Sequence, residues 1–189
     1  MSATSIPAPR RHLVTVQEYL RMGETGVLNA DGRFELVEGE IIDMPPIGPP
    51  HASDTNLLAR LLTLALGDRA IVSSQNPVVL GDLSAPQPDI AVLRPRDDFY
   101  RDAHPKPEDV LLVVEVADSS LSHDRNRKLP LYARFGIPEA WLIEVAHRLI
   151  DIHRDPVDGR YTTQFRLHPP ALISPVMLPD LTLDLSPLL

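Results

Sequence analysis

Residues 111–116 read LLVVEV, an apolar run that contains one carboxylate. Five of the six residues are apolar, and such a run is typical of a strand that is covered on both faces of a sheet. Glu115 lies inside the run, where an ionised carboxylate costs several kcal/mol unless a partner compensates it. The neighbours of Glu115 therefore bear on both the fold and the function.

The segments on either side of this strand predict further strands. FELVEGEIIDM (34–44) predicts a hairpin whose turn contains Glu38-Gly39, because glycine accepts a positive φ there. Residues 139–145 and 148–154 predict a second hairpin. The remaining strand predictions cover residues 70–74, 77–80, 88–95 and, after the turn at Asp158-Gly159, 161–167.

Helical patterns lie between these strands. TVQE (15–18) is a capping-box pattern that opens a short helix, which Gly23 can end. Residues 51–67 show the apolar spacing of an amphipathic helix. Residues 120–136 predict a loop that leads into a helix with Pro130 in its first turn. The predicted fold class is α/β or α+β, with one mixed central sheet flanked by helices and with additional β-hairpins.

Length and composition bound the class of protein. The chain has 189 residues, and we expect a flexible tail over residues 1–12 and a single domain over residues 13–189. Cysteine is absent, which excludes disulfides, thiolate zinc sites and cysteine nucleophiles. The first residues lack the apolar segment of a signal peptide, and no stretch has the apolar length that spans a bilayer. We therefore expect a soluble, cytoplasmic protein with no membrane partner.

The charge balance bears on nucleic-acid binding. The formal net charge is −8 at pH 7, whereas proteins that bind phosphate backbones usually show a basic footprint. An activity on DNA or RNA would therefore need a local basic patch or a metal ion. The best candidate patch is the basic cluster of Arg125, Arg127 and Arg134 beside Lys128, although a solvated charge run explains these residues equally well.

Two carboxylates mark adjacent strand predictions. Asp89 opens one strand, and Glu115 lies near the end of the next long one. If the two strands are neighbours, both carboxylates can converge at one end of the sheet, where Mg²⁺ or Mn²⁺ would relieve their repulsion. The alternative is a structural ion pair between Glu115 and Arg125, Arg127 or Lys128, since charge networks often perturb such groups without function.

Lys128 allows two interpretations. Asp124 precedes it by four residues, so the two side chains can form an ordinary pair on a helix surface. Alternatively, its ammonium lies beside Asp89 and Glu115, where it could orient a water molecule or neutralise charge on a phosphoryl oxygen.

The run from PDIAV (88–92) through LLVVEVADSSLSHDRNRKLPLYARFGIPEAWLIEV (111–145) resembles the Uma2 family of bacterial proteins assigned as endonucleases, within the PD-(D/E)xK nuclease superfamily. FELVEGEI (34–41) and His51 match as well. The resemblance implies a restriction-endonuclease-like core and a metal-dependent hydrolysis of phosphodiester bonds, with DNA favoured over RNA. Because related nucleases are often dimers, we also expect a homodimer.

The resemblance also assigns roles to single residues. It implies that Asp89 is the PD aspartate and Glu115 the acidic residue of (D/E)xK, that both hold Mg²⁺ or Mn²⁺, and that one acidic residue comes from the N-terminal part. Glu35 is the first choice for that residue, and Glu38 the second. Ala117 stands where the motif has its lysine, so the resemblance implies that Lys128 supplies the ammonium from the following helix.

Several other polar residues are weighed more lightly. His51 is a further site candidate, with helix capping or loop packing as its structural alternative, and Gln75 is another at a strand edge. His123 is expected to be solvated, and Trp141 to lie in the core. Because Ala117 replaces the motif lysine, the alternative function is a nuclease-fold module that binds nucleic acid or protein without cutting.

Overall fold

A computed structural model describes residues 10–29 and 31–189, so most of the expected tail lies outside the described residues. Its centre is a six-stranded mixed sheet with the order β3-β4-β5-β6-β7-β8. Only β5 and β6 are parallel, and every other neighbouring pair is antiparallel. These strands are β3 (Ile71–Ser74), β4 (Ile90–Leu93), β5 (Val110–Ala117), β6 (Glu139–Glu144), β7 (Leu149–Val157) and β8 (Arg160–Arg166).

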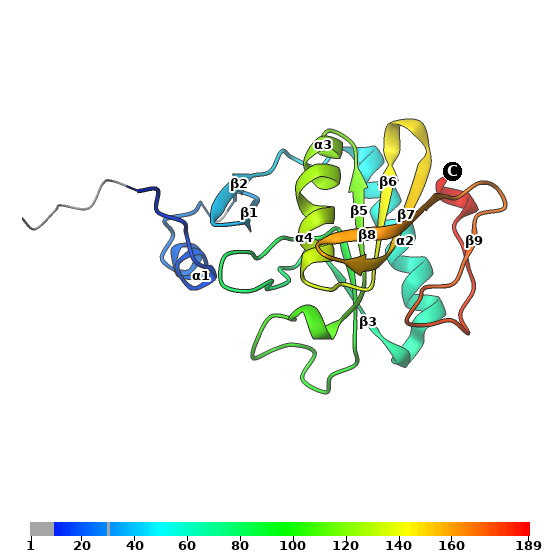
Figure 1. The fold of residues 1–189 in the computed structure, drawn as a ribbon, viewed down its shortest axis with the longest axis horizontal. Coiled ribbons are helices and arrows are strands. Elements are labelled where there is room, and N and C mark those ends of the chain that lie inside the picture. Colours follow the sequence, from blue (N-terminus) through cyan, green and yellow to red (C-terminus); the bar gives the residue numbers. More distant parts are fainter. Residues whose placement is uncertain (1–9, 30) are drawn as a thin grey trace, which may run out of the picture.

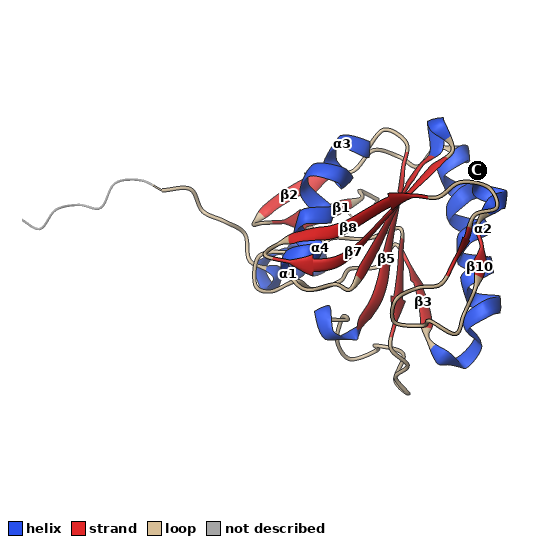
Figure 2. Cartoon of the chain, turned by 45° about the vertical axis from the view of Figure 1, so that its right-hand side comes forward, coloured by secondary structure: helices blue, strands red, loops and turns tan. Residues whose placement is uncertain are grey.

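Helices cover both faces of this sheet (Figures 1 and 2). One face packs against α2 (Pro49–Leu66) and the C-terminal segment, which contains β9 (Leu172–Ile173) and β10 (Leu183–Asp184). The other face packs against a continuous helical segment. That segment is made of α3 (Leu121–His123), the π-helical turn η3 (Asp124–Lys128) and α4 (Leu129–Arg134). The predicted mixed sheet flanked by helices is confirmed.

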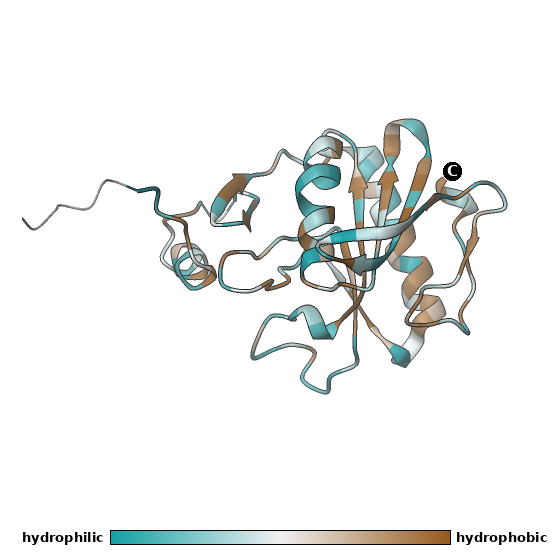
Figure 3. Ribbon diagram, in the orientation of Figure 1, coloured by the Kyte–Doolittle hydropathy of each residue, from teal (hydrophilic) through white to brown (hydrophobic). Residues whose placement is uncertain are grey.

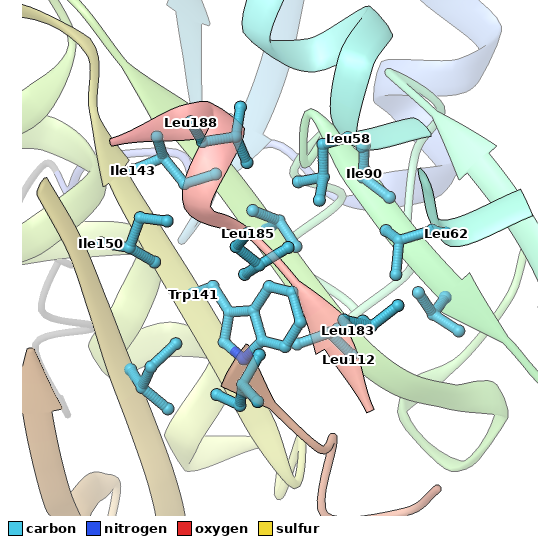
Figure 4. Close-up of a cluster of buried hydrophobic side chains, with 14 of the residues drawn as sticks. Leu58, Leu62, Ile90, Leu112, Trp141, Ile143, Ile150, Leu183, Leu185 and Leu188 are labelled. Carbon is cyan, nitrogen blue, oxygen red and sulfur yellow. The ribbon is translucent and has the colours of Figure 1, made fainter. Parts of the chain in front are cut away.

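The larger apolar cluster lies between the sheet and α2. Trp141 is fully buried there, as the sequence predicts, and packs among leucines of α2 and of the C-terminal segment (Figure 4). Colouring by hydropathy shows the same concentration of apolar residues along the central strands (Figure 3). Burying each large aliphatic side chain contributes about 1.5–3 kcal/mol, so this cluster supplies much of the stability that holds the sheet in place.

Strand β5 is the centre of the fold, and all eight of its residues are buried. Period-two alternation predicts that Leu111 and Glu115 lie on the same face of the sheet. In the structure Leu111 lies on the opposite face, in the apolar cluster beside α2. A β-bulge explains the difference, because the pairing with β4 shifts between Val92 and Leu93. From Leu112 to Val116 the alternation holds.

A hairpin and a short helix lie beside the main sheet. Strands β1 (Phe34–Val37) and β2 (Glu40–Asp43) pair antiparallel, with Glu38 at φ 52° and Gly39 at φ 79° in the turn. Positive φ at both turn positions is the type I′ geometry of two-residue hairpins, so the hairpin prediction is confirmed. Helix α1 (Val16–Glu24) begins with the predicted capping box of Thr15.

Two segment predictions are wrong. Residues 77–80 form no strand. Val78 and Leu80 donate main-chain hydrogen bonds within the loop that connects β3 to β4, and Val79 donates one to Pro105 of another loop. The segment before Pro130 is helical from Leu121 onward, whereas the sequence predicts a loop as far as the first turn of α4. The π-helical turn ends at Lys128, two residues before this proline, which has no amide hydrogen to donate.

Helix boundaries differ slightly from the prediction. Helix α2 starts at Pro49 rather than residue 51, because two prolines occupy its first turn, and Gly67 ends it as expected. Helix α1 runs one residue past Gly23. Among the described residues, no helix combines the length and apolar character needed to cross a bilayer.

Candidate active site

Sheet register brings Asp89 and Glu115 together. Ile90 of β4 pairs with Val114 of β5, so the next residue outward on each strand is Asp89 and Glu115 respectively. Asp89 is 6% exposed and Glu115 is 2% exposed, and both line a cavity of about 40 Å³. The expected convergence of the two carboxylates at one end of the sheet is therefore present.

Three donors hold the Asp89 carboxylate. His51 Nε2 lies 2.9 Å from Oδ1, the Gln75 amide donates to the same oxygen at 3.1 Å, and the Val116 amide hydrogen is donated to Oδ2 at 2.9 Å. Burial raises the pKa of Asp89, but the hydrogen bond with His51, the Lys128 ammonium and the Val116 amide outweigh burial, so the pKa lies below its usual value. His51 and Gln75 thus both contact Asp89.

Glu115 has a different environment. Its Oε1 accepts hydrogen bonds from Lys128 Nζ at 2.8 Å and from the Tyr132 hydroxyl at 2.5 Å. Complete burial is the main reason that the pKa of Glu115 lies well above its usual value. The charge of Lys128 lowers this pKa, whereas the charges of Asp124 and Asp89 raise it further. Within the described residues, Oε2 of Glu115 accepts no hydrogen bond, so it remains available as a ligand atom.

Lys128 reaches the carboxylates from the π-helical turn. Its side chain is 2% exposed, and its Nζ lies 2.8 Å from Glu115, 3.3 Å from Glu35 and 3.8 Å from Asp124. Burial lowers the pKa of Lys128, but these three carboxylates raise it by more, so the ammonium stays protonated. Ala117, at the motif position, packs its methyl group into the apolar cluster under α4. The ammonium at this site therefore comes from the following helical segment.

The hairpin supplies Glu35 rather than Glu38. Glu35 is 1% exposed and bonds to His123 Nε2 at 2.8 Å and to the Gln87 amide at 3.2 Å. Burial raises the pKa of Glu35, but the Lys128 charge and the hydrogen bonds from His123 and Gln87 lower it to about 2. Glu38 lies in the turn and pairs with arginines outside the cavity.

The three candidate phosphate-binding arginines are already paired with carboxylates. Arg125 contacts Glu144 and Asp151, Arg127 contacts Glu38 and Glu40, and Arg134 contacts Glu38. A nucleic acid would have to displace these carboxylates before it could bind the arginines. The three arginines therefore do not form a free phosphate-binding patch within the described residues.

Gln87 and Tyr132 contact the site but were not predicted from the sequence. Asp124 was expected as a helix-surface partner of Lys128, and the two residues do pair, but inside the buried cavity. His123 is bonded to Glu35 rather than solvated. Asp124, Lys128 and Tyr132 follow one another at intervals of four, which is a helical signal for one shared face. The Asp124–Lys128 spacing was recognised in the sequence but not its extension to Tyr132, because a loop was expected before Pro130.

The donor set fits one class of metal ion. Among residues 10–29 and 31–189, no three His, Asp or Glu side chains are placed to ligate a single ion, whereas zinc sites use three or four protein ligands. Glu115 Oε2 has no hydrogen-bond partner in that part of the chain, and Asp89 Oδ2 accepts one hydrogen bond although a carboxylate oxygen can accept two. Mg²⁺ is commonly held by one or two carboxylates with several waters, so Asp89 and Glu115 suit Mg²⁺ or Mn²⁺.

Charge within the cavity points the same way. Five acidic side chains line it, against the two cationic side chains of Arg33 and Lys128. The acidic residues are Glu35, Asp89, Glu115, Asp118 and Asp124. Such an excess of negative charge favours a cation over an anion at this place.

Comparisons with known proteins give the family. The profile of a family described as "Uma2: Putative restriction endonuclease" matches residues 16–186. The "Uncharacterized protein sll1609" of Synechocystis sp. is 29% identical over 124 residues, which cover 64% of this chain and 68% of that protein. A crystal structure described as a "putative nuclease belonging to DUF820" from Anabaena variabilis has a TM-score of 0.69 and 18% identity. The match covers 93% of this chain and 97% of that one. The structural likeness shows a shared nuclease-like fold, and from the extent of the profile match the chain belongs to the Uma2 family.

Proposed function

We propose that this protein is an endonuclease that hydrolyses phosphodiester bonds of DNA with Mg²⁺ or Mn²⁺. One observation carries the proposal: Lys128 Nζ lies 2.8 Å from Glu115 Oε1 in a cavity that Asp89 also lines. Two carboxylates and an ammonium in a shared cavity are the groups that metal-assisted phosphoryl chemistry requires. The family description, which names restriction endonucleases, favours DNA over RNA.

Asp89 and Glu115 would hold the ion. When bound, the ion would polarise the scissile phosphate and lower the pKa of a water molecule. The donors on Asp89 and the Tyr132 hydroxyl on Glu115 fix the orientation of the two carboxylates before an ion arrives. Such preorganisation is needed because misplaced ligand groups lower both affinity and rate.

Lys128 would act next to these carboxylates. Its ammonium can orient the attacking water and offset the negative charge that develops on a phosphoryl oxygen. Glu35 and Asp124 share the charge of Lys128 and, together with Glu115, hold the buried ammonium within the cavity. Their role in the proposed reaction is to position Lys128.

DNA cleavage by the purified protein tests this proposal. We expect nicking or degradation in Mg²⁺ or Mn²⁺ and none in EDTA. Asp89→Ala and Glu115→Ala should each abolish cleavage while circular dichroism shows that the fold survives. Glu38→Gln is the matched control, because Glu38 lies outside the cavity, and it should cut as the wild type does. Unchanged cleavage in both alanine variants would end the assignment.

A second candidate function is a nuclease-fold module that binds nucleic acid or protein without cutting. The observation in its favour is that Lys128 Nζ already has three carboxylates within 3.8 Å. These carboxylates largely neutralise its charge, which leaves little to stabilise a phosphoryl oxygen. This candidate predicts DNA or protein binding with no cleavage in any divalent metal. Metal-dependent cleavage that is lost in Asp89→Ala excludes it.

A further inference from the structure

Arg33 differs from the other basic residues near the site. It immediately precedes β1 and lines the same cavity as Asp89, Glu115 and Lys128. Its Nη1 donates one hydrogen bond, to the carbonyl oxygen of Pro45 at 3.1 Å. It forms no ion pair with any carboxylate of residues 10–29 and 31–189, and the remaining residues, 1–9 and Ala30, include no Asp or Glu.

The charge of Arg33 is therefore available to a ligand. A guanidinium carries five N–H donors in a planar fork, and the contact with Pro45 uses one of them. By contrast, Lys128 is surrounded by three carboxylates, and Arg125, Arg127 and Arg134 are each paired. Among the residues that line the cavity, Arg33 is thus the cation best able to accept an anionic partner from outside.

The space around Arg33 indicates which part of a substrate it would meet. The catalytic cavity has about 40 Å³, room for roughly three water molecules and too little for a nucleoside. A groove of about 290 Å³ adjoins it, and Arg33 and Gln87 line both spaces. The groove walls include the apolar side chains of Leu20, Phe34 and Pro77.

We infer that Arg33 binds a backbone phosphate next to the scissile bond, and that the adjoining nucleotide lies in the groove under α1. This inference rests on the proposed nuclease function, since it assigns the substrate path of the same site. The guanidinium fork matches two oxygens of a phosphate group, which gives a shorter and stronger contact than a neutral hydrogen bond. The apolar walls suit the face of a sugar or base, while Arg33 holds the charged backbone at the mouth of the cavity.

Binding of a short fluorescein-labelled DNA strand, measured by fluorescence anisotropy in Ca²⁺, tests the inference without requiring turnover. We expect Arg33→Ala to weaken binding about 10-fold or more, because hydrogen bonds to charged groups are the strong ones. The slope of log affinity against log salt should fall by about 1. Arg33→Lys keeps the charge but loses the fork, so its affinity should lie between those of the wild type and Arg33→Ala.

Arg60→Ala is the matched control, because Arg60 is exposed on α2 and does not line this cavity or the groove. It removes the same charge and should change affinity by less than about twofold, since exposed charges away from the ligand are screened. Circular dichroism melting checks that Arg33→Ala folds. Equal weakening by Arg33→Ala and Arg60→Ala, or no DNA binding by the wild type, would overturn the inference. Arg33-dependent binding without cleavage would instead refute the nuclease assignment and leave the phosphate contact standing.

Discussion

The carboxylates of Glu35, Glu115 and Asp124, all buried, share the buried ammonium of Lys128 at distances of 2.8 to 3.8 Å. Removing one partner of a buried charge network costs far more than removing a surface ion pair, because the remaining charges lose both water and their counter-ion. Glu115 can respond by binding a proton, since burial already raises its pKa. Glu35 stays ionised instead, because its pKa is lowered to about 2. The same four residues therefore control both stability and the proposed chemistry.

We predict that Lys128→Met lowers the free energy of unfolding by about 3–5 kcal/mol and abolishes cleavage. Urea unfolding at neutral pH measures the first effect. Adding Glu115→Gln should recover part of the loss, because it removes one of the stranded charges. Lys106→Met is the control, since Lys106 is exposed, and it should stay within about 0.5 kcal/mol of the wild type. A loss of similar size in both lysine variants would contradict the network.

The lowered pKa of Glu35 predicts a specific acid sensitivity. Its folded pKa, about 2, lies below its ordinary value of 4.5, so the ionised group stabilises the fold above pH 4.5. That contribution, about 3 kcal/mol by linkage, is lost as the pH falls towards 2. In urea unfolding at several pH values, Glu35→Gln should therefore lose less stability than the wild type over this range. Parallel curves for the two proteins would show that the ionised Glu35 does not stabilise the fold. Glu38→Gln is the control, because Glu38 is only partly buried and lies outside the cavity.

At the scale of elements, the hairpin, β5 and the helical segment from Leu121 to Arg134 each deliver one part of the site. The hairpin and β5 could be predicted, because alternation and the Glu38-Gly39 turn are local signals. Local sequence wrongly predicts a strand over residues 77–80. Apolar residues there pack against loops rather than against a neighbouring strand, and the local pattern is the same in both cases. The helix before Pro130 was not predicted because proline usually lies in the first turn of a helix. The π-helical turn also departs from the regular spacing of an α-helix, so the apolar pattern there does not indicate one.

Gly39 tests the backbone conformation of the hairpin turn. Gly39 has φ 79°, and a Cβ atom there would lie 2.6 Å from Cβ of Leu13. We expect Gly39→Ala to cost about 1–3 kcal/mol, from strain and from displacement of the segment at Leu13. Gly23→Ala is a control of opposite sign, because Gly23 is helical with nothing within 4 Å of the new methyl group, and it should stabilise by about 0.5–1 kcal/mol. Thermal or urea unfolding measures both, and a neutral Gly39→Ala would contradict the account of the turn.

For the whole molecule, composition restricted the function without identifying it. The net charge of −8 argued against a general affinity for nucleic acid, and the structure adds that the obvious arginine cluster is already paired. Asp89 and Glu115 could be matched from sequence because each belongs to a predicted strand. The partners that hold them come from distant segments, such as His51 and Tyr132, and only the tertiary fold brings these together.

This charge balance predicts that DNA association depends on a divalent ion. In EDTA the acidic cavity repels a phosphate backbone, so affinity for DNA should fall at least about 10-fold relative to Ca²⁺ at the same ionic strength. Fluorescence anisotropy in the two conditions measures the difference. Equal affinity in EDTA and Ca²⁺ would place the DNA-binding surface away from the carboxylates.

The homodimer expected from the resemblance stays a prediction. Strand β8 is an edge of the central sheet, and six of its seven residues are exposed. Its outer edge therefore carries main-chain groups that pair with no other strand of the described residues. Light scattering of the purified protein would measure the oligomeric state. A monomer at all accessible concentrations would show that the protein does not form this dimer.

Asp89 and Glu115 are proposed to hold a divalent cation beside Lys128, and calorimetric titration of the protein with Mn²⁺ measures this binding. The wild type should bind one ion, and Asp89→Asn should lose that binding while it remains folded. Asp68→Asn is the matched control, because Asp68 is exposed after α2, and it should bind as the wild type does. No binding by the wild type, or equal binding by Asp89→Asn, would show that these carboxylates do not hold the ion.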